Sequence, residues 1–245
     1  MHDYIIYFLV TLFFSSFFAM GGVGSAIALV SIFPMLGQSF NLSRALALFV
    51  NTSSTFSASI MNFYRGVLDF KFAMPLVVAV LISTPIGAYL SQFVNHKILS
   101  WMLIVFLLVS ATLMLFYKRE AKTSYTKTWV LYAVGLGVGV ISGMLGVGGG
   151  ALIMPLLILL GFDAKKAAYT VSFVIPFSSL GAFITYLQFV KMDWLLLADV
   201  TVAALIGGYV GGKIMHFKLS QKSVKKLIGI VLYLIAIKMI MKMIY

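Results

Sequence analysis

The sequence predicts an all-α polytopic membrane protein built from two inverted-topology repeats, each with a glycine-broken, re-entrant helix pair plus three spanning helices. Three observations carry this prediction: the composition, the lengths of the apolar runs, and an internal duplication. Of the 245 residues, 62% are hydrophobic and 10% are charged, whereas soluble domains average about 25% charged residues. The chain has no cysteine and six acidic residues, which argues against a soluble enzyme and against thiolate metal sites.

Eight apolar runs are long enough to be membrane segments, because a spanning helix needs about 20 apolar residues. They are Tyr4–Leu36, Ala45–Phe63, Phe72–Val94, Ile98–Tyr117, Trp129–Leu160, Ala167–Val190, Trp194–Gly212 and Leu227–Ile244. Glycines interrupt the first run at Gly21–Gly24 and the fifth at Gly146–Gly150. The first run lacks a basic stretch before it, so we interpret it as mature structure rather than a signal peptide.

The two halves of the chain, residues 1–120 and 125–245, read as copies of each other. Gly22-Val23-Gly24-Ser25 corresponds to Gly146-Val147-Gly148-Gly149, and Gly37 and Gly161 end the two broken runs. Ile86-Gly87-Ala88-Tyr89 likewise corresponds to Ile206-Gly207-Gly208-Tyr209. The short polar linker Lys118–Lys127 separates the copies, so we expect two transmembrane repeats of four runs each.

The basic residues favour inverted over parallel repeats, because cytoplasmic loops carry an excess of Lys and Arg. If every run crossed once, nine basic residues would lie on each side. If each broken run enters and leaves on one face, thirteen lie on one side and five on the other. Those five are Arg44, Lys97, Lys191, Lys238 and Lys242. A net charge of +12 therefore indicates anchored loops and no nucleic-acid partner.

The broken runs are the first candidate site. A straight helix over the 33 residues of Tyr4–Leu36 would be about 50 Å long, too long for a core of about 30 Å. Two half-helices fit instead, and their N-termini would meet near the midplane, where unpaired N–H groups attract an anion. The candidate residues are Gly22, Gly24, Ser25, Gly146, Gly148, Gly149 and Gly150. The alternatives are a flexible joint between short helices, or close helix packing through small residues.

Polar side chains within the following runs are the second candidate set. In the first half they are Asn51, Thr52 and Ser53. In the second half, among several polar residues that include Ser179, the candidates are Ser172, Ser178, Tyr186 and Gln188. Such groups coordinate an anion without placing a fixed charge in lipid. The alternative is that these groups bond to neighbouring helices or back to their own helix.

One carboxylate within a run, Asp199, is a candidate for ion or proton coupling, although it is close enough to the end of its run to reach the interface. The three histidines, His2, His96 and His216, fall outside the centres of the runs, so we expect no histidine-bound metal. We also expect no cofactor.

A resemblance follows from two stretches. Gly143–Gly150 (GMLGVGGG), followed by Pro155 and by Gly161–Ala167 (GFDAKKA), resembles the TauE/SafE family of sulfite and organosulfonate exporters. The resemblance covers the whole chain, although Ser25 and Ala26 replace glycines in the N-terminal copy. It implies export of a small sulfur-containing anion across a prokaryotic inner membrane.

The sequence therefore favours a secondary transporter of a small oxyanion that works by alternating access. A passive anion channel and a non-transporting membrane subunit remain alternatives. An enzyme is disfavoured, because the runs contain no plausible acid–base pair. The expected surroundings are the lipid bilayer and the anionic substrate, and a homodimer is one assembly open to the chain.

Overall fold

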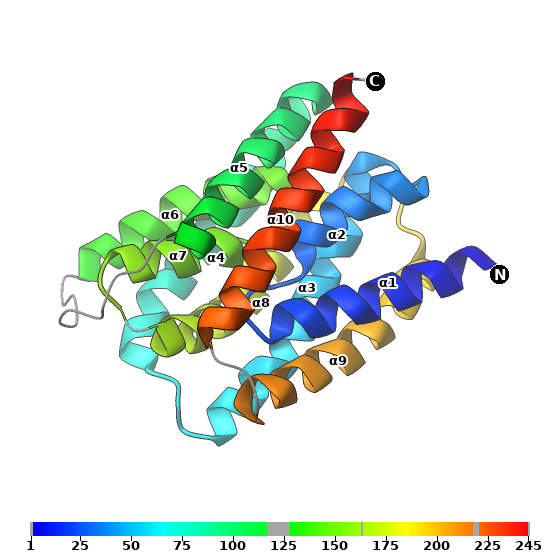
Figure 1. Ribbon diagram of the computed structural model, residues 1–245. Coiled ribbons are helices and arrows are strands. Elements are labelled where there is room, and N and C mark those ends of the chain that lie inside the picture. The colour runs from blue at the N-terminus through cyan, green and yellow to red at the C-terminus, as the bar shows by residue number, and fades with distance from the viewer. Residues whose placement is uncertain (1, 117–127, 163, 218–220, 245) are drawn as a thin grey trace.

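The computed structural model describes residues 2–116, 128–162, 164–217 and 221–244, and throughout these ranges the regular structure is helical (Figure 1). The central linker 118–127, Asp163 and Lys218 lie outside the described residues. The elements are α1 (His2–Ala19), α2 (Ala26–Ile32), η1 (Phe33–Leu36), α3 (Phe40–Tyr64), α4 (Phe70–Leu90), η2 (Ser91–Phe93), α5 (His96–Phe116), α6 (Thr128–Leu145), α7 (Gly150–Leu159), α8 (Ala164–Tyr186), α9 (Trp194–Phe217) and α10 (Gln221–Ile244).

Five stretches of the described chain are long and apolar enough to cross a membrane by length and composition: Phe70–Phe93, His96–Phe116, Thr128–Leu145, Lys166–Tyr186 and Trp194–Ile214. The outer faces of these helices carry large apolar side chains. Ile82, Val105 and Val202, for example, are each more than half exposed. Such a surface suits lipid rather than water, so the chain is a multi-pass membrane protein.

Both glycine-rich runs break where the sequence predicts. α1 ends at Ala19 and α2 begins at Ala26, while α6 ends at Leu145 and α7 begins at Gly150. The breaks contain backbone with positive φ, at Gly22 (67°) in the first and Gly146, Gly148 and Gly149 (71–72°) in the second. Glycine adopts this conformation without the steric penalty that a Cβ would bring.

The first broken run returns to the end at which it began. The Tyr7 hydroxyl, near the start of α1, donates a 2.8 Å hydrogen bond to the carbonyl of Leu36, the last residue of η1. The run therefore forms a folded-back hairpin, in which α2 and η1 retrace part of the length that α1 covers.

Helices α3 and α8 form the centre of the bundle and run in opposite directions, since Asn51 contacts Ser179 whereas Asn62, further along α3, contacts Ser172, earlier in α8. α5 and α10 lie side by side (Figure 1) and are joined by a 2.5 Å hydrogen bond between the Thr112 and Tyr233 hydroxyls.

Two further helix pairs pack through glycine. α6 packs along α4 and α1 along α9, and the second pair is seen at the lower right of Figure 1. A Cβ on Gly143 would overlap the Thr84 carbonyl, and a Cβ on Gly211 would overlap the Ser16 carbonyl. Glycine at these positions lets the two backbones touch.

Candidate functional site

The two broken runs meet at the crossing of α3 and α8, around the side chain of Asn51. Asn51 and Ser179 have no exposed surface. The Asn51 Nδ2 donates a 2.8 Å hydrogen bond to the Ser179 hydroxyl, and its Oδ1 accepts a 3.3 Å bond from the backbone N–H of Ala26. One amide thus joins the start of α2 to helix α8 of the other half.

Glycines from both turns lie in close contact with this amide. A Cβ on Gly24 would overlap Asn51 Oδ1, and a Cβ on Gly148 would overlap both Asn51 Nδ2 and the Ser179 hydroxyl. The absence of side chains at these two positions is what lets the turns approach each other. Ala26 is the first residue of α2, so its hydrogen bond to Asn51 satisfies one of the free backbone N–H groups at the N-terminus of that helix.

The N-terminus of α7 has a different environment. Its N-cap, Gly149, has φ 72° and offers no side chain to cap the helix. Beside it lies Ser178, whose hydroxyl is fully buried and has no hydrogen-bond partner; a Cβ on Gly149 would lie 3.5 Å from that oxygen. A buried hydroxyl without a partner is uncommon in proteins, and this one lies beside the start of a helix, where a partial positive charge gathers.

The structure brings five of the predicted residues to this junction: Gly24, Asn51, Gly148, Gly149 and Ser178. Gly150 begins α7 under the side chain of Ile175. Ser25 is buried at the start of α2, with its hydroxyl 3.2 Å from that of Ser15. Gly22 packs against Ala168, and Gly146 packs against the side chain of Arg44.

The remaining predicted residues lie elsewhere. Thr52 and Ser53 donate to the carbonyls of Leu48 and Phe49 in their own helix, as the back-bonding alternative describes. The Ser172 hydroxyl accepts a 3.0 Å bond from Asn62. Gln188 is exposed in the turn after α8. Asp199 is half-buried in α9, and its Oδ2 has no partner.

The most informative residue that sequence reasoning passed over is Arg44. The sequence places it in the gap before an apolar run, as an interface anchor, but its side chain is 1% exposed. It donates a 2.7 Å bond to the carbonyl of Met144, and Tyr186 donates to the same carbonyl at 3.0 Å. Its guanidinium carbon lies 4.8 Å from the centre of the Tyr186 ring. No local feature of the sequence separates it from the other basic residues between the runs, since 18 basic residues share six acidic ones.

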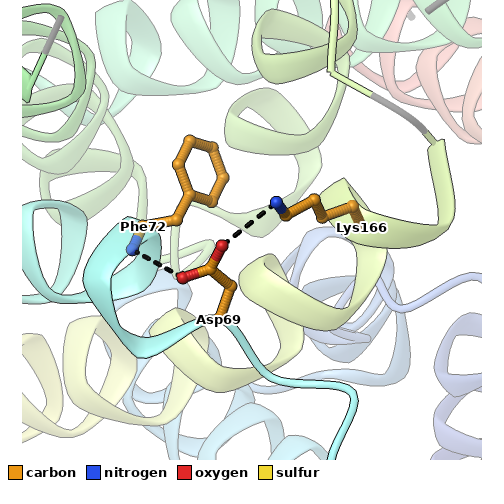
Figure 2. Close-up of polar contacts among 3 residues, drawn as sticks. All are labelled: Asp69, Phe72 and Lys166. Carbon is orange, nitrogen blue, oxygen red and sulfur yellow. Dashed lines mark hydrogen bonds and ion pairs between the residues drawn. The ribbon is translucent and has the colours of Figure 1, made fainter. Parts of the chain in front are cut away.

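An ion pair joins the two halves at the opposite end of α3 and α8 (Figure 2). Asp69, the N-cap of α4, accepts a 3.3 Å bond from the backbone N–H of Phe72, and its Oδ2 lies 3.0 Å from Lys166 Nζ. The hydrogen bond from Lys166 lowers the pKa of Asp69 below its ordinary value of 3.8. Both side chains are more than 40% exposed, so this pair is open to screening by solvent.

Comparison with known proteins now identifies the family. Residues 7–239, nearly the whole chain, match the family model described as sulfite exporter TauE/SafE. The chain belongs to the TauE/SafE family. No solved structure matches it.

Relatives of this TauE/SafE chain carry names of the same kind. A probable membrane transporter protein, YunE of Bacillus subtilis, is 30% identical over 63% of this chain and 64% of its own length. Another, YdhB of the same species, is 27% identical over 80% of this chain and 83% of its own. A third, MJ0441 of Methanocaldococcus jannaschii, is 26% identical over 68% of this chain and 66% of its own. Together with the apolar helices, these matches support a membrane transporter.

Proposed function

We propose that the chain is a secondary transporter that exports a small sulfur-containing oxyanion, such as sulfite or an organosulfonate, by alternating access of two inverted repeats, residues 1–120 and 125–245. The family match supports the substrate class. The observation that carries the mechanism is the buried junction of the two glycine turns at Asn51, since irregular backbone at membrane depth is tolerated where it is buried in protein or lines a pathway.

Recurring contacts support the two repeats. Several close contacts between the two halves occur twice. In the second occurrence each residue is replaced by its equivalent in the other half, 124 positions away. The matched pairs are Gly22–Ala168 with Gly146–Arg44, Gly87–Val140 with Gly211–Ser16, and Gly139–Ser83 with Gly207–Ser15. These contacts make Gly211 the equivalent of Gly87, in place of Gly207, which the match of Ile86–Tyr89 with Ile206–Tyr209 had indicated. Such exchange of partners is expected of a two-fold relation between the halves.

The directions of equivalent helices support inversion. α3 and α8 are equivalent under this shift and run in opposite directions, as the pairs Asn51–Ser179 and Asn62–Ser172 require. Parallel repeats related by an axis along the membrane normal would give equivalent helices the same direction across the bilayer. The folded-back first run adds no net crossing, so three crossings remain in each repeat, and an odd number inverts the second copy.

The substrate would bind where the α7 N-terminus, Gly149 and the Ser178 hydroxyl converge. The hydroxyl is a donor without a partner, and the helix start adds partial positive charge. A membrane potential negative inside favours exit of an anion by about 2.3 kcal/mol per charge per 100 mV. Export could therefore proceed as uniport. Asp199, with its unpartnered Oδ2, is the candidate if an ion gradient is coupled instead.

Flux of sulfite and sulfoacetate in proteoliposomes, with the potential clamped by a potassium gradient and valinomycin, tests the proposal. We expect saturable uptake or release that follows the clamped potential. Fast, non-saturating flux would indicate a channel, and dependence on a pH gradient alone would replace uniport with coupling. Absence of flux for these and other small anions would favour a non-transporting subunit. We place the protein in a prokaryotic inner membrane, as a monomer or homodimer.

A further inference from the structure

Arg44 is the one charged residue among the buried polar side chains that the structure describes. Its side chain is 1% exposed and is the largest fully buried side chain of the described residues. One terminal nitrogen donates to the Met144 carbonyl and the other to the Asn41 amide oxygen, while Nε has no partner. The guanidinium carbon lies 4.9 Å from the centre of the Phe40 ring and 4.8 Å from that of Tyr186.

The charge of this guanidinium is not balanced by any described carboxylate. Within the described ranges, Asp69 forms an ion pair with Lys166, and no acidic side chain forms one with Arg44. The acceptors that Arg44 does have are neutral. A buried charged group is normally paired with an opposite charge or becomes neutral by gaining or losing a proton. Arginine does not become neutral, because it keeps its proton. The geometry therefore leaves a positive charge and a free N–H donor, which together match an oxyanion.

Arg44 can also leave its protein acceptor without orphaning it. The Met144 carbonyl lies at the C-terminal end of α6, where carbonyls lack partners within the helix. The Tyr186 hydroxyl lies 3.0 Å from this carbonyl and 3.1 Å from that of Gly143. Its single proton can go to the Met144 carbonyl, because the Gly143 carbonyl also accepts a 3.3 Å bond from the backbone N–H of Gly146. Capping of α6 thus does not depend on Arg44, and exchange of the Met144 carbonyl for an anion leaves no buried carbonyl unpaired.

The position of Arg44 relates it to the central junction. It lies seven residues before Asn51 on α3, about 10 Å along the helix, and its side chain packs against the Gly146 turn. Its partner under the 124-residue shift is Ala168, which packs against Gly22. The cation is therefore present at one end of the α3–α8 pair and replaced by a methyl group at the other.

We infer that Arg44 is a substrate-binding residue, at which the oxygens of the transported oxyanion replace the Met144 carbonyl on the guanidinium. This inference rests on the proposed anion transport and assigns the anion to one end of the pathway. The planar fork of N–H donors on arginine suits a sulfite or sulfonate group, because two adjacent oxygens of such a group can accept hydrogen bonds from the same guanidinium. Before binding, Tyr186 and Phe40 hold the guanidinium by their ring faces.

The test compares substrate affinity in three variants, by KM in the clamped flux assay and by the anion-induced rise in Tm of the purified protein. In Arg44→Gln we expect KM for the transported anion to rise about ten- to a hundredfold and the anion-induced Tm rise to disappear. Arg44→Lys keeps the charge but not the fork, so we expect a smaller rise in KM. Lys97→Gln removes an equal charge from an exposed site at the start of α5 and should leave KM unchanged.

The outcomes separate the two proposals. Wild-type flux with an unchanged KM in Arg44→Gln would overturn the assignment of Arg44 and leave the transport function intact. A lower Tm without substrate, combined with an unchanged KM, would reduce Arg44 to a structural role. If Arg44→Gln does not fold, Arg44→Lys decides, because a wild-type KM there contradicts fork recognition. No anion transport or anion-induced Tm rise by the wild type would overturn the proposed function and this inference together.

Discussion

At the residue scale, glycine has two separate functions at the junction of the turns. Gly146 and Gly149 supply positive φ, at 72° each, which the backbone needs in order to reverse direction. Gly24 and Gly148 supply space, because a Cβ on either would overlap Asn51. Substitution at Gly149 therefore strains the backbone, and substitution at Gly24 displaces a buried hydrogen-bonded side chain. Substitution at Gly148, whose φ is 71°, does both, and a Cβ on Gly146 would also overlap the Arg44 side chain.

Removal of the Ser178 hydroxyl tests the substrate site at the junction with little disturbance of the structure. Ser178→Ala removes a buried hydroxyl that has no partner, so we expect the free energy of unfolding to change by less than about 1 kcal/mol. The same change should weaken substrate binding if Ser178 donates to the anion. Flux and Tm are the measurements.

Ser110→Ala is the matched control, because Ser110 is equally buried and unpartnered but lies in α5, away from the junction. It should match Ser178→Ala in stability and the wild type in flux. Equal flux in both variants would remove Ser178 from the site.

At the element scale, the close approach of α6 to α4 depends on glycine. A Cβ on Gly143 would overlap a backbone carbonyl of α4, which cannot rotate away. We expect Gly143→Ala to lower the free energy of unfolding by about 1–3 kcal/mol. Gly137 is on the same helix with open space around it, so Gly137→Ala should be neutral. Thermal unfolding in detergent compares them, and equal Tm values would show that this contact is not tight.

The ion pair between Asp69 and Lys166 connects the first turns of α4 and α8 (Figure 2). Because the folded state lowers the pKa of Asp69 below 3.8, the pair stabilises the protein above that pH, and this contribution is lost as the pH falls through the lowered pKa. Asp69→Asn keeps an N-cap residue but removes the charge.

We therefore expect Asp69→Asn to be less stable than the wild type at pH 6, by no more than about 1 kcal/mol for so exposed a pair. The difference should shrink as the pH is lowered below 4. A difference in Tm that stays constant from pH 6 to pH 3 would mean that the charge of Asp69 has no part in it.

At the scale of the whole molecule, the orientation of the repeats is directly testable because the chain has no cysteine. Single-cysteine variants at four exposed lysines report which side each end of a helix faces. Inverted repeats place Lys71→Cys and Lys213→Cys on one side, and Lys97→Cys and Lys191→Cys on the other. Labelling of intact cells with an impermeant maleimide distinguishes the sides. Parallel repeats would instead place Lys71→Cys and Lys191→Cys together.

Much of the architecture was predictable because it depends on local properties of the chain. The apolar runs correspond to the observed helices, and both breaks fall at the predicted glycines. Positive φ at Gly37 and Gly161 accounts for the ends of the two broken runs. Asn51 and Ser178 were recognisable as polar groups in apolar runs. Thr52 and Ser53 looked the same in sequence, but their hydroxyls bond within α3.

The sequence by itself determined the membrane class, the helical segments and the two broken runs, since apolar length and backbone conformation are set by neighbouring residues. The tertiary structure alone decided which polar groups meet. Asn51 reaches Ser179 because α3 and α8 cross in opposite directions. Arg44 is buried because Tyr186 and the end of α6, both from the other half, close over it. Such contacts join residues a hundred or more positions apart, and no local pattern encodes them.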